Sequence, residues 1–191
     1  EAAGVAAMQL EDQEFPKKCG HTPGRRVIPG AEMVARIKVA VDARAEPDFL
    51  IMARTDARTG HGLDEALRRA EAYAKAGADI LFVESPESEE EMRRIAEATD
   101  LPLVVNMVEG GRTPLLPASD LQEMGYKIAL FPVAVLLGAA EAARRLYAGI
   151  KEAGSTAGAG VPLFDFDAFS RLMGFEEVWA FEEKWADEDE G

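Results

Sequence analysis

Short apolar runs alternate with longer amphipathic stretches along the first 131 residues. Five runs have the length and composition of β-strands, at residues 5–10, 49–53, 79–83, 101–105 and 127–131. Periodic apolar positions predict helices between them, over residues 31–45, 63–76 and 89–98, and a further helix over residues 135–151. Strands that alternate with helices indicate a parallel sheet, so the pattern predicts an α/β fold.

Polar side chains end the first four predicted strands. They are Glu11 and Asp12, then Arg54, Thr55 and Asp56, then Glu84 and Ser85, and then Asn106. In a (β/α)8 barrel the carboxyl ends of all strands meet at one mouth, whereas in an open sheet they spread along an edge. No G-x-G-x-x-G or Walker-type loop follows the first strand, which argues against a nucleotide-binding open sheet. The pattern therefore favours a TIM-type barrel.

Five strands do not complete such a barrel, which needs eight strands and about 250 residues. We expect about three N-terminal βα units to be missing, or roughly 90 residues at about 30 per unit. Residues 1–152 are predicted to form the C-terminal five-strand part of the barrel, residues 153–162 a linker of small residues, and residues 163–191 a C-terminal helical extension. The extension is rich in aromatic residues, so it is expected either to form contacts between subunits or to pack on its own barrel.

Composition narrows the class of partner. The 191 residues carry 35 acidic and 21 basic side chains, a formal charge of −14, and 48% of them are hydrophobic. Such a surface repels nucleic-acid backbones and anionic membranes, and no apolar run approaches the roughly 20 residues that cross a bilayer. The sequence has one cysteine, which cannot form an internal disulfide and suits a reducing compartment. We expect a cytoplasmic protein that binds neither nucleic acid nor membranes.

The loop after the first predicted strand holds the strongest candidate chemistry. It runs over residues 13–29, longer than the usual βα connection of about 2–6 residues, and is predicted to act as a lid around residues 17–26. Within it, the positive charges of Lys17, Lys18 and His21 favour the thiolate form of Cys19, although a purely structural cysteine is the alternative. A zinc site at Cys19 and His21 would lack a second ligand pair. His61 is predicted to be a surface residue in a flexible loop.

Several motifs occur in an order and spacing that resemble the isocitrate lyase/phosphoenolpyruvate mutase superfamily, most closely its 2-methylisocitrate lyase branch. They are Glu11-Asp12-Gln13, Lys17-Lys18-Cys19-Gly20-His21, residues 52–57, Glu84, Asn106 and residues 113–115. The resemblance implies a TIM barrel, dependence on Mg²⁺, and cleavage of a carbon–carbon bond in a 2-hydroxy tricarboxylate to give succinate and a 2-oxo acid such as pyruvate. It also implies a homo-oligomer, a dimer or tetramer, formed through the C-terminal helices.

The resemblance assigns a role to each candidate residue. Cys19 is the general acid that protonates the succinate carbanion, and the catalytic group also includes Lys17, His21 and Arg54. The residues expected to bind the di- or tricarboxylate are Lys18, Gly20, Arg54, Glu84, Asn106 and Thr113. Glu11 is expected to hold Mg²⁺ through water, while the main metal aspartates of the family lie upstream, so this chain alone is expected to bind Mg²⁺ poorly.

Alternatives remain open at this point. One alternative interpretation makes Arg54 part of a buried ion pair with Asp56 or Glu84, and Asn106 an amide that caps a turn. An alternative function is that of a carboxyphosphonoenolpyruvate phosphonomutase or an oxaloacetate decarboxylase of the same superfamily. A non-catalytic subunit made of a partial barrel is the remaining alternative.

Overall fold

The structure is a computed structural model that describes residues 1–186. Contacts between residues divide the chain into two compact units, Glu1–Val135 and Leu136–Gly191. This division falls earlier than the boundary predicted at residue 152, because the long helix that begins at the end of the first unit has no buried residue. Each unit is described by itself.

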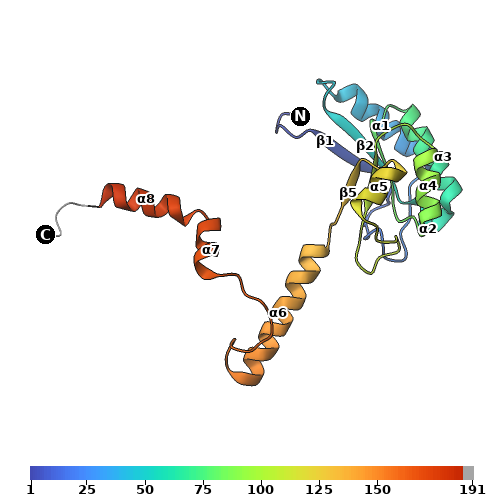
Figure 1. Cartoon of the computed structure of the whole chain (residues 1–191). Helices are drawn as coiled ribbons and strands as arrows, with labels where there is room; N and C mark the ends of the chain where they lie inside the picture. Colours follow the sequence, from blue (N-terminus) through green and yellow to red (C-terminus); the bar gives the residue numbers. More distant parts are fainter. Residues whose placement is uncertain (187–191) are drawn as a thin grey trace. The chain divides into compact units, whose positions relative to one another are not determined.

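The first unit is built on one parallel sheet (Figure 1). Its strands, each paired in parallel with the next, are β1 (Ala7–Glu11), β2 (Leu50–Thr55), β3 (Ile80–Val83), β4 (Leu103–Asn106) and β5 (Ile128–Leu130). The strand order is β1-β2-β3-β4-β5, which is the order along the sequence. All five predicted strands are therefore confirmed, with ends shifted by a few residues.

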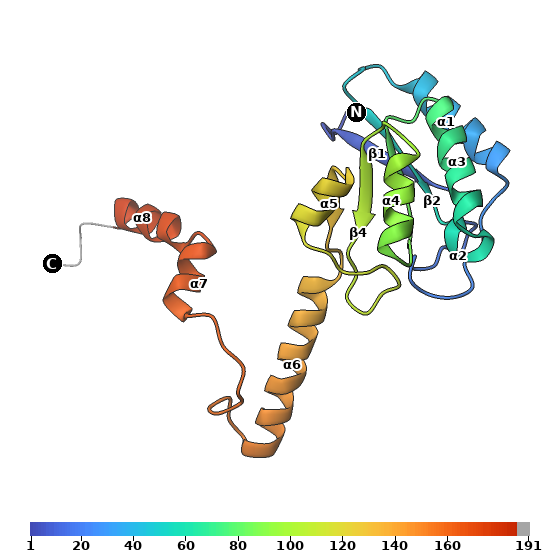
Figure 2. The ribbon, with the colours of Figure 1, turned by 45° about the vertical axis from the view of Figure 1, so that its right-hand side comes forward.

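Helices lie between consecutive strands, with α1, α3 and α4 on the same side of the sheet (Figure 2). The helices of the first unit are α1 (Gly30–Ala43), α2 (Ala57–His61), α3 (Leu63–Lys75), α4 (Glu89–Glu97) and α5 (Ala118–Met124). In α3 the buried positions Leu63, Ala66, Ala70 and Tyr73 recur at helical spacing, which explains both the helix and the face it buries. The helix ends just before Gly77, whose φ of 104° suits glycine.

The two faces of the sheet differ in what they bury. Ala53, Leu81 and Val105 lie on the helix side, in the large apolar cluster that all of α1, α3, α4 and α5 share. The alternate positions Phe82 and Val104 form a smaller cluster on the opposite face. Helices on one face and strands in sequential order are typical of a barrel wall, since a doubly wound sheet is covered on both faces.

Short helices are where the sequence-based prediction fell short. It missed α2 and α5, which have five and seven residues, too few for a periodic pattern to show. His61 is exposed as predicted, but it ends α2 and does not lie in a flexible loop. Ser88 caps the start of α4, because its Oγ accepts a hydrogen bond from the Glu91 amide at 3.1 Å.

The second unit contains all but the first two residues of α6 (Ala134–Ala153), followed by α7 (Phe166–Leu172) and α8 (Phe175–Trp185). None of these three helices has a buried residue. Large apolar side chains are correspondingly exposed, among them Phe166 at 81%, Trp179 at 47% and Trp185 at 66%. No helix within residues 1–186 is both long and apolar enough to span a membrane. The end of the predicted extension, residues 187–191, lies outside the described residues.

Candidate active site

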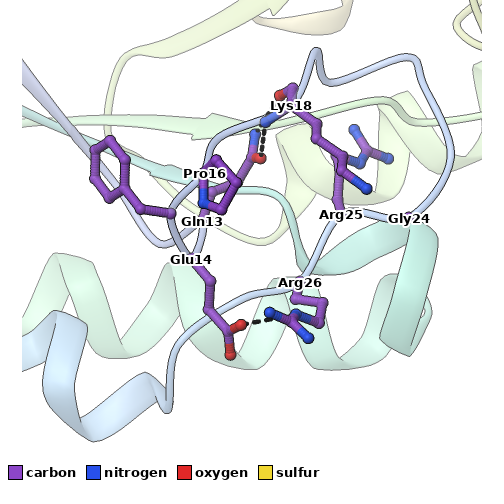
Figure 3. Close-up of a pocket in the computed structure, with 8 residues that line it drawn as sticks. Gln13, Glu14, Pro16, Lys18, Gly24, Arg25 and Arg26 are labelled. Atoms are coloured by element: carbon purple, nitrogen blue, oxygen red, sulfur yellow. Dashed lines mark hydrogen bonds and ion pairs between the residues drawn. The ribbon is translucent and has the colours of Figure 1, made fainter.

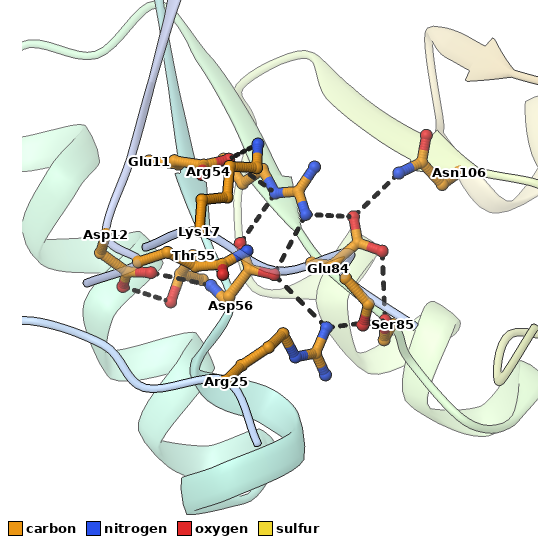
Figure 4. A network of polar contacts seen from close by, with 12 residues as sticks. Glu11, Asp12, Lys17, Arg25, Arg54, Thr55, Asp56, Glu84, Ser85 and Asn106 are labelled. Carbon is orange, nitrogen blue, oxygen red and sulfur yellow. Dashed lines mark hydrogen bonds and ion pairs between the residues drawn. The ribbon is translucent and has the colours of Figure 1, made fainter. Parts of the chain in front are cut away.

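Alternation along the strands brings the polar ends to one face of the sheet. Arg54, Glu84 and Asn106 follow Met52, Phe82 and Val104 by two residues each, so they share the face opposite the helices. Figure 4 shows these three side chains meeting at the ends of β2, β3 and β4. The structure thus brings together residues that lie up to 52 positions apart in the sequence, from Arg54 to Asn106.

Arg54 occupies the centre of this group. Its Nε and Nη2 donate to the two carboxylate oxygens of Asp56 at 2.8 and 3.0 Å, and its Nη2 lies 3.3 Å from Glu84 Oε2. The guanidinium carbon lies 5.0 Å from the centre of the Phe82 ring. Burial would lower the pKa of Arg54, but Asp56 and Glu84 outweigh it and raise that pKa. The structure therefore contains the ion pair that was the alternative interpretation of Arg54. This pair fixes the orientation of the guanidinium, which remains at the strand ends.

Glu84 has a fully buried side chain, as Asp56 does. Its Oε2 accepts a hydrogen bond from Asn106 Nδ2 at 2.9 Å, and its Oε1 lies 2.9 Å from His21 Nε2. Burial would raise the pKa of Glu84, but the contact with His21 and the charge of Arg54 outweigh burial and lower that pKa. The carboxylate therefore stays charged at neutral pH and needs its cationic neighbours.

Glu11 lies at the end of β1 beside Arg54. Its Oε2 accepts a hydrogen bond from Lys17 Nζ at 2.7 Å and lies 3.6 Å from Arg54 Nε. Its side chain remains 17% exposed, in contrast to the fully buried Glu84. Glu11 is thus a carboxylate of the group that solvent still reaches.

The loop between β1 and α1 is held against these strand ends at several points. The Gly20 carbonyl accepts a hydrogen bond from Ser85 Oγ at 2.7 Å. His21 Nδ1 accepts one from the Arg112 amide at 3.0 Å, which leaves Nε2 as the protonated nitrogen facing Glu84. The loop therefore lies on the same side of the sheet as Arg54 and Glu84.

Cys19 lies in this loop with an exposed free thiol. Lys17 Nζ lies 2.7 Å from Glu11 Oε2, and His21 Nε2 lies 2.9 Å from Glu84 Oε1. Among residues 1–186, no side chain donates a hydrogen bond to the Cys19 sulfur. The structure thus holds the residue that follows Cys19, Gly20, against Ser85, while the predicted activation of the thiol by Lys17 and His21 stays a prediction.

Lys18 occupies a different place from the other predicted substrate ligands. Its backbone amide and carbonyl are both bound by the Gln13 side chain, each at 3.0 Å. Its side chain lines a cavity of about 250 Å³ beneath the loop, together with Arg25 and Arg26 (Figure 3). The lining includes neither Arg54 nor Glu84, so the structure does not bring Lys18 into the strand-end group.

Thr113, the last predicted ligand, is 4% exposed. Its hydroxyl is buried and has no hydrogen-bond partner among the described residues. An unpaired buried hydroxyl is costly unless a ligand or water satisfies it, which agrees with a binding role.

Asp12 follows Glu11 directly but points to the opposite face of the sheet. Its Oδ2 accepts hydrogen bonds from Thr55 Oγ1 at 2.7 Å, Tyr73 Oη at 2.8 Å and Arg69 Nη1 at 3.0 Å. Burial and the charge of Asp12 together raise the pKa of Tyr73. Asp12 therefore ties β1 to β2 and α3 from within the core.

Sequence reasoning missed two residues that complete the strand-end group. Asp56 was weighed only as a partner of Arg54, and Arg25 was not considered. Arg25 lies in the loop, yet its side chain is 2% exposed and reaches Asp56 and Ser85. The signal available in the sequence was an arginine late in a loop that had already been predicted to cover the site.

The described residues do not form a magnesium site by themselves. No group of three or more histidine, cysteine or acidic side chains converges within residues 1–186 in a way that would hold a metal ion. Glu11, the predicted ligand, already faces Lys17 and Arg54. One carboxylate between two cations is a poor donor set for Mg²⁺, which prefers several oxygen ligands.

Comparisons with known proteins decide the family. The sequence model described as "Phosphoenolpyruvate phosphomutase" matches residues 1–151. The chain belongs to the phosphoenolpyruvate mutase/isocitrate lyase superfamily. The resemblance inferred from the motifs is confirmed, and so is the prediction of an α/β fold made from part of a TIM barrel.

Two relatives show how much of a superfamily protein this chain represents. It is 53% identical over 178 residues to the 2,3-dimethylmalate lyase of Eubacterium barkeri, covering 93% of this chain and 62% of that protein. It is 45% identical over 153 residues to the 2-methylisocitrate lyase of Bacillus subtilis (strain 168), covering 80% of this chain and 50% of that one. The chain thus spans between half and two thirds of these superfamily members.

Solved structures agree with the assignment of the chain to this superfamily. A crystal structure of 2,3-dimethylmalate lyase matches with a TM-score of 0.83 and 34% identity, covering 100% of this chain and 64% of that one. A phosphonopyruvate hydrolase in complex with oxalate and Mg²⁺ matches with a TM-score of 0.77 and 28% identity, covering 97% and 65%. That phosphonopyruvate hydrolase therefore binds Mg²⁺.

Proposed function

We propose that this chain supplies the loop and five strands of a Mg²⁺-dependent carbon–carbon lyase that cleaves a 2-methylisocitrate-type 2-hydroxy tricarboxylate to succinate and pyruvate. The observation that carries the proposal is the contact of the Cys19 loop with the strand ends, through Gly20 on Ser85 and His21 on Glu84. This contact supports the proposal because it fixes the backbone next to the exposed Cys19 to the strand ends that carry the buried Arg54. Such a cleavage requires an acid that protonates the carbanion, and it also requires a cation that binds a carboxylate of the substrate.

The residues divide the chemistry between them. Arg54 binds a substrate carboxylate, and Asn106 and Thr113 complete a polar subsite around Glu84. When the carbon–carbon bond breaks, its electron pair passes to the succinate fragment, and Cys19 gives that carbon the proton of its thiol. The substrate hydroxyl passes its proton through a general base to solvent and becomes the carbonyl of the 2-oxo acid. The closed loop excludes water and so limits protonation from solvent.

The proposed mechanism uses Mg²⁺, although the described residues do not form a complete site for this ion. When bound in the complete protein, the ion would neutralise the oxygens of the 2-oxo acid. Of the residues present, Glu11 is the one that solvent still reaches beside Arg54, and it would hold the ion through water. Its other ligands would come from outside this chain.

A second substrate is favoured by one comparison. The relative named for 2,3-dimethylmalate has 53% identity, against 45% for the one named for 2-methylisocitrate. The first acid carries two carboxylates and the second carries three. A site for the smaller acid would need one group fewer to bind a carboxylate. Lys18 is a predicted carboxylate ligand that does not reach the strand-end group, because its side chain lines the loop cavity.

A substrate panel tests the proposal. The protein with its complete barrel is incubated with Mg²⁺ and, in turn, threo-2-methylisocitrate, 2,3-dimethylmalate, isocitrate and oxaloacetate. Release of a 2-oxo acid is followed for the first three, and loss of the substrate is followed for oxaloacetate. Turnover of 2-methylisocitrate supports the leading proposal, and turnover of 2,3-dimethylmalate alone supports the second. Turnover of oxaloacetate alone, or of none of the four, would contradict both.

The proposal also covers the oligomeric state and the cellular location of the protein. The C-terminal unit leaves Phe166, Trp179 and Trp185 exposed, and we propose that a second copy of the protein covers them in a dimer or tetramer. Sedimentation velocity of the protein with and without residues 154–191 tests this, because a single species of monomer mass in both would contradict it. The lone cysteine supports a cytoplasmic location for the protein.

A further inference from the structure

Arg25 links the loop to two strand ends from a buried position. Its side chain is 2% exposed, although it belongs to a loop. Its Nη1 lies 3.4 Å from Asp56 Oδ1 and donates to Ser85 Oγ at 3.3 Å, and its Nη2 donates to Thr59 Oγ1. The guanidinium therefore joins the loop to β2, β3 and α2 at once.

Asp56 is shared between two arginines. Its carboxylate is fully buried, and it accepts two hydrogen bonds from Arg54 as well as the contact from Arg25 (Figure 4). A buried carboxylate with two guanidinium partners is held in one orientation, since each partner fixes a different direction. The orientation of Arg54 thus depends on how firmly Asp56 is held.

The charges explain why the loop must supply this second arginine. Three carboxylates lie within 3.6 Å of Arg54, those of Glu11, Asp56 and Glu84. With Arg54 as their only fixed cation, these acids would leave a net negative site that repels an anionic substrate. Lys17 on Glu11 and Arg25 on Asp56, both from the loop, bring the count to three cations for three acids.

We propose that Arg25 is a positioning residue, which holds Asp56 and so aims Arg54 at the substrate carboxylate only while the loop is in place. The proposal rests on the proposed function for its kinetic consequence. Its structural part, the coupling of Arg25 to Arg54 through Asp56, stands on the contacts above.

The kinetic test compares two neighbouring arginines. Arg25→Gln is expected to lower kcat/KM by roughly 10–100-fold, because Asp56, the partner of Arg54, is no longer held in one orientation. Arg25→Lys keeps the positive charge but lacks the planar guanidinium, so its kcat/KM should lie between that of Arg25→Gln and that of the wild type. The matched control is Arg26→Gln, because the Arg26 side chain is 76% exposed and pairs with Glu14, outside the strand-end group. It should stay within about twofold of wild type.

A double-mutant cycle separates positioning from a general loss of folding. If Arg25 acts through Asp56, Arg25→Gln should cost little further activity in the Asp56→Asn background. Losses that simply add would show that Arg25 acts independently of Asp56, and would overturn the proposal.

A readout without turnover keeps the two proposals distinguishable. In arginine-¹⁵N-labelled protein, the Nε–H resonance of Arg54, assigned by its loss in Arg54→Lys, reports the bond to Asp56. It should shift in Arg25→Gln and stay in place in Arg26→Gln. A wild-type protein that turns over no acid would contradict the proposed function alone, whereas an Arg54 resonance that ignores Arg25→Gln would overturn the role of Arg25.

Discussion

The backbone of Gly20 lies so close to Glu84 that no side chain fits between them. A Cβ atom at Gly20 would lie 2.6 Å from the carboxyl carbon of Glu84 and 2.6 Å from its Oε1. Glu84 cannot move away easily, because Asn106 and Arg54 hold its other oxygen. The contact joins the loop to the sheet as closely as van der Waals radii permit.

Gly20→Ala should therefore displace the loop. Crowding of this kind costs about 1–3 kcal/mol, and a similar loss in the closed loop would lower kcat/KM by roughly 5–100-fold. Hydrogen exchange over residues 17–26 should become faster. The matched control is Gly60→Ala, where no atom lies within 4 Å of the new Cβ and the glycine lies inside α2. Equal exchange in both variants would count against the close contact.

Cys19→Ser should abolish lyase turnover and leave the fold intact. A serine hydroxyl is a far weaker acid than a thiol, so it cannot protonate the carbanion at a useful rate. The side chain is exposed, and the free energy of unfolding should change by no more than about 0.5 kcal/mol. Assays of 2-oxo acid release beside urea unfolding curves check both halves. A variant that keeps its turnover would remove Cys19 from the mechanism.

Asp12→Ala should destabilise the protein strongly. It would leave Arg69 with one fewer acidic partner in a buried position, at a cost of about 3–5 kcal/mol in the free energy of unfolding. Asp64→Ala is the control, since the Asp64 side chain is 89% exposed and pairs only with Arg94 at the surface. Its cost should be below about 1 kcal/mol. Similar urea midpoints for the two variants would contradict the core role of Asp12.

The stability of the protein should fall in acid, in part through Glu84. The pKa of Glu84 in the folded chain lies below its ordinary value of 4.5, so the unfolded chain binds the proton more readily. The contribution is full above pH 4.5 and is lost as the pH falls through the folded pKa. Urea unfolding between about pH 6 and about pH 3 should show a shallower acid decline in Glu84→Gln than in wild type. Parallel declines would mean that Glu84 carries no such shift.

The strand-end group was accessible from the sequence because strands alternate and parallel strands end together. Arg54, Glu84 and Asn106 each follow a short apolar run, and that alone places them at one edge. The same alternation distinguishes Glu11 from Asp12, which face opposite sides of the sheet.

Contacts made by the loop were not accessible in this way. Arg25 meets Asp56 across 31 positions, and the path of a loop is set by many small contacts that no periodic pattern encodes. The direction of Lys18 is another example. Its neighbour Lys17 reaches Glu11, while Lys18 turns into a separate cavity because Gln13 holds its backbone.

The central claim is that Cys19, Arg54 and Glu84 serve one small carboxylic acid, and alkylation of Cys19 tests it most directly. The rate at which iodoacetamide modifies Cys19 is followed by mass spectrometry of its peptide, with and without succinate, in the wild type and in Arg54→Gln. Succinate should slow the modification in the wild type and leave the Arg54→Gln rate unchanged. A wild-type rate that saturating succinate does not alter would contradict the account.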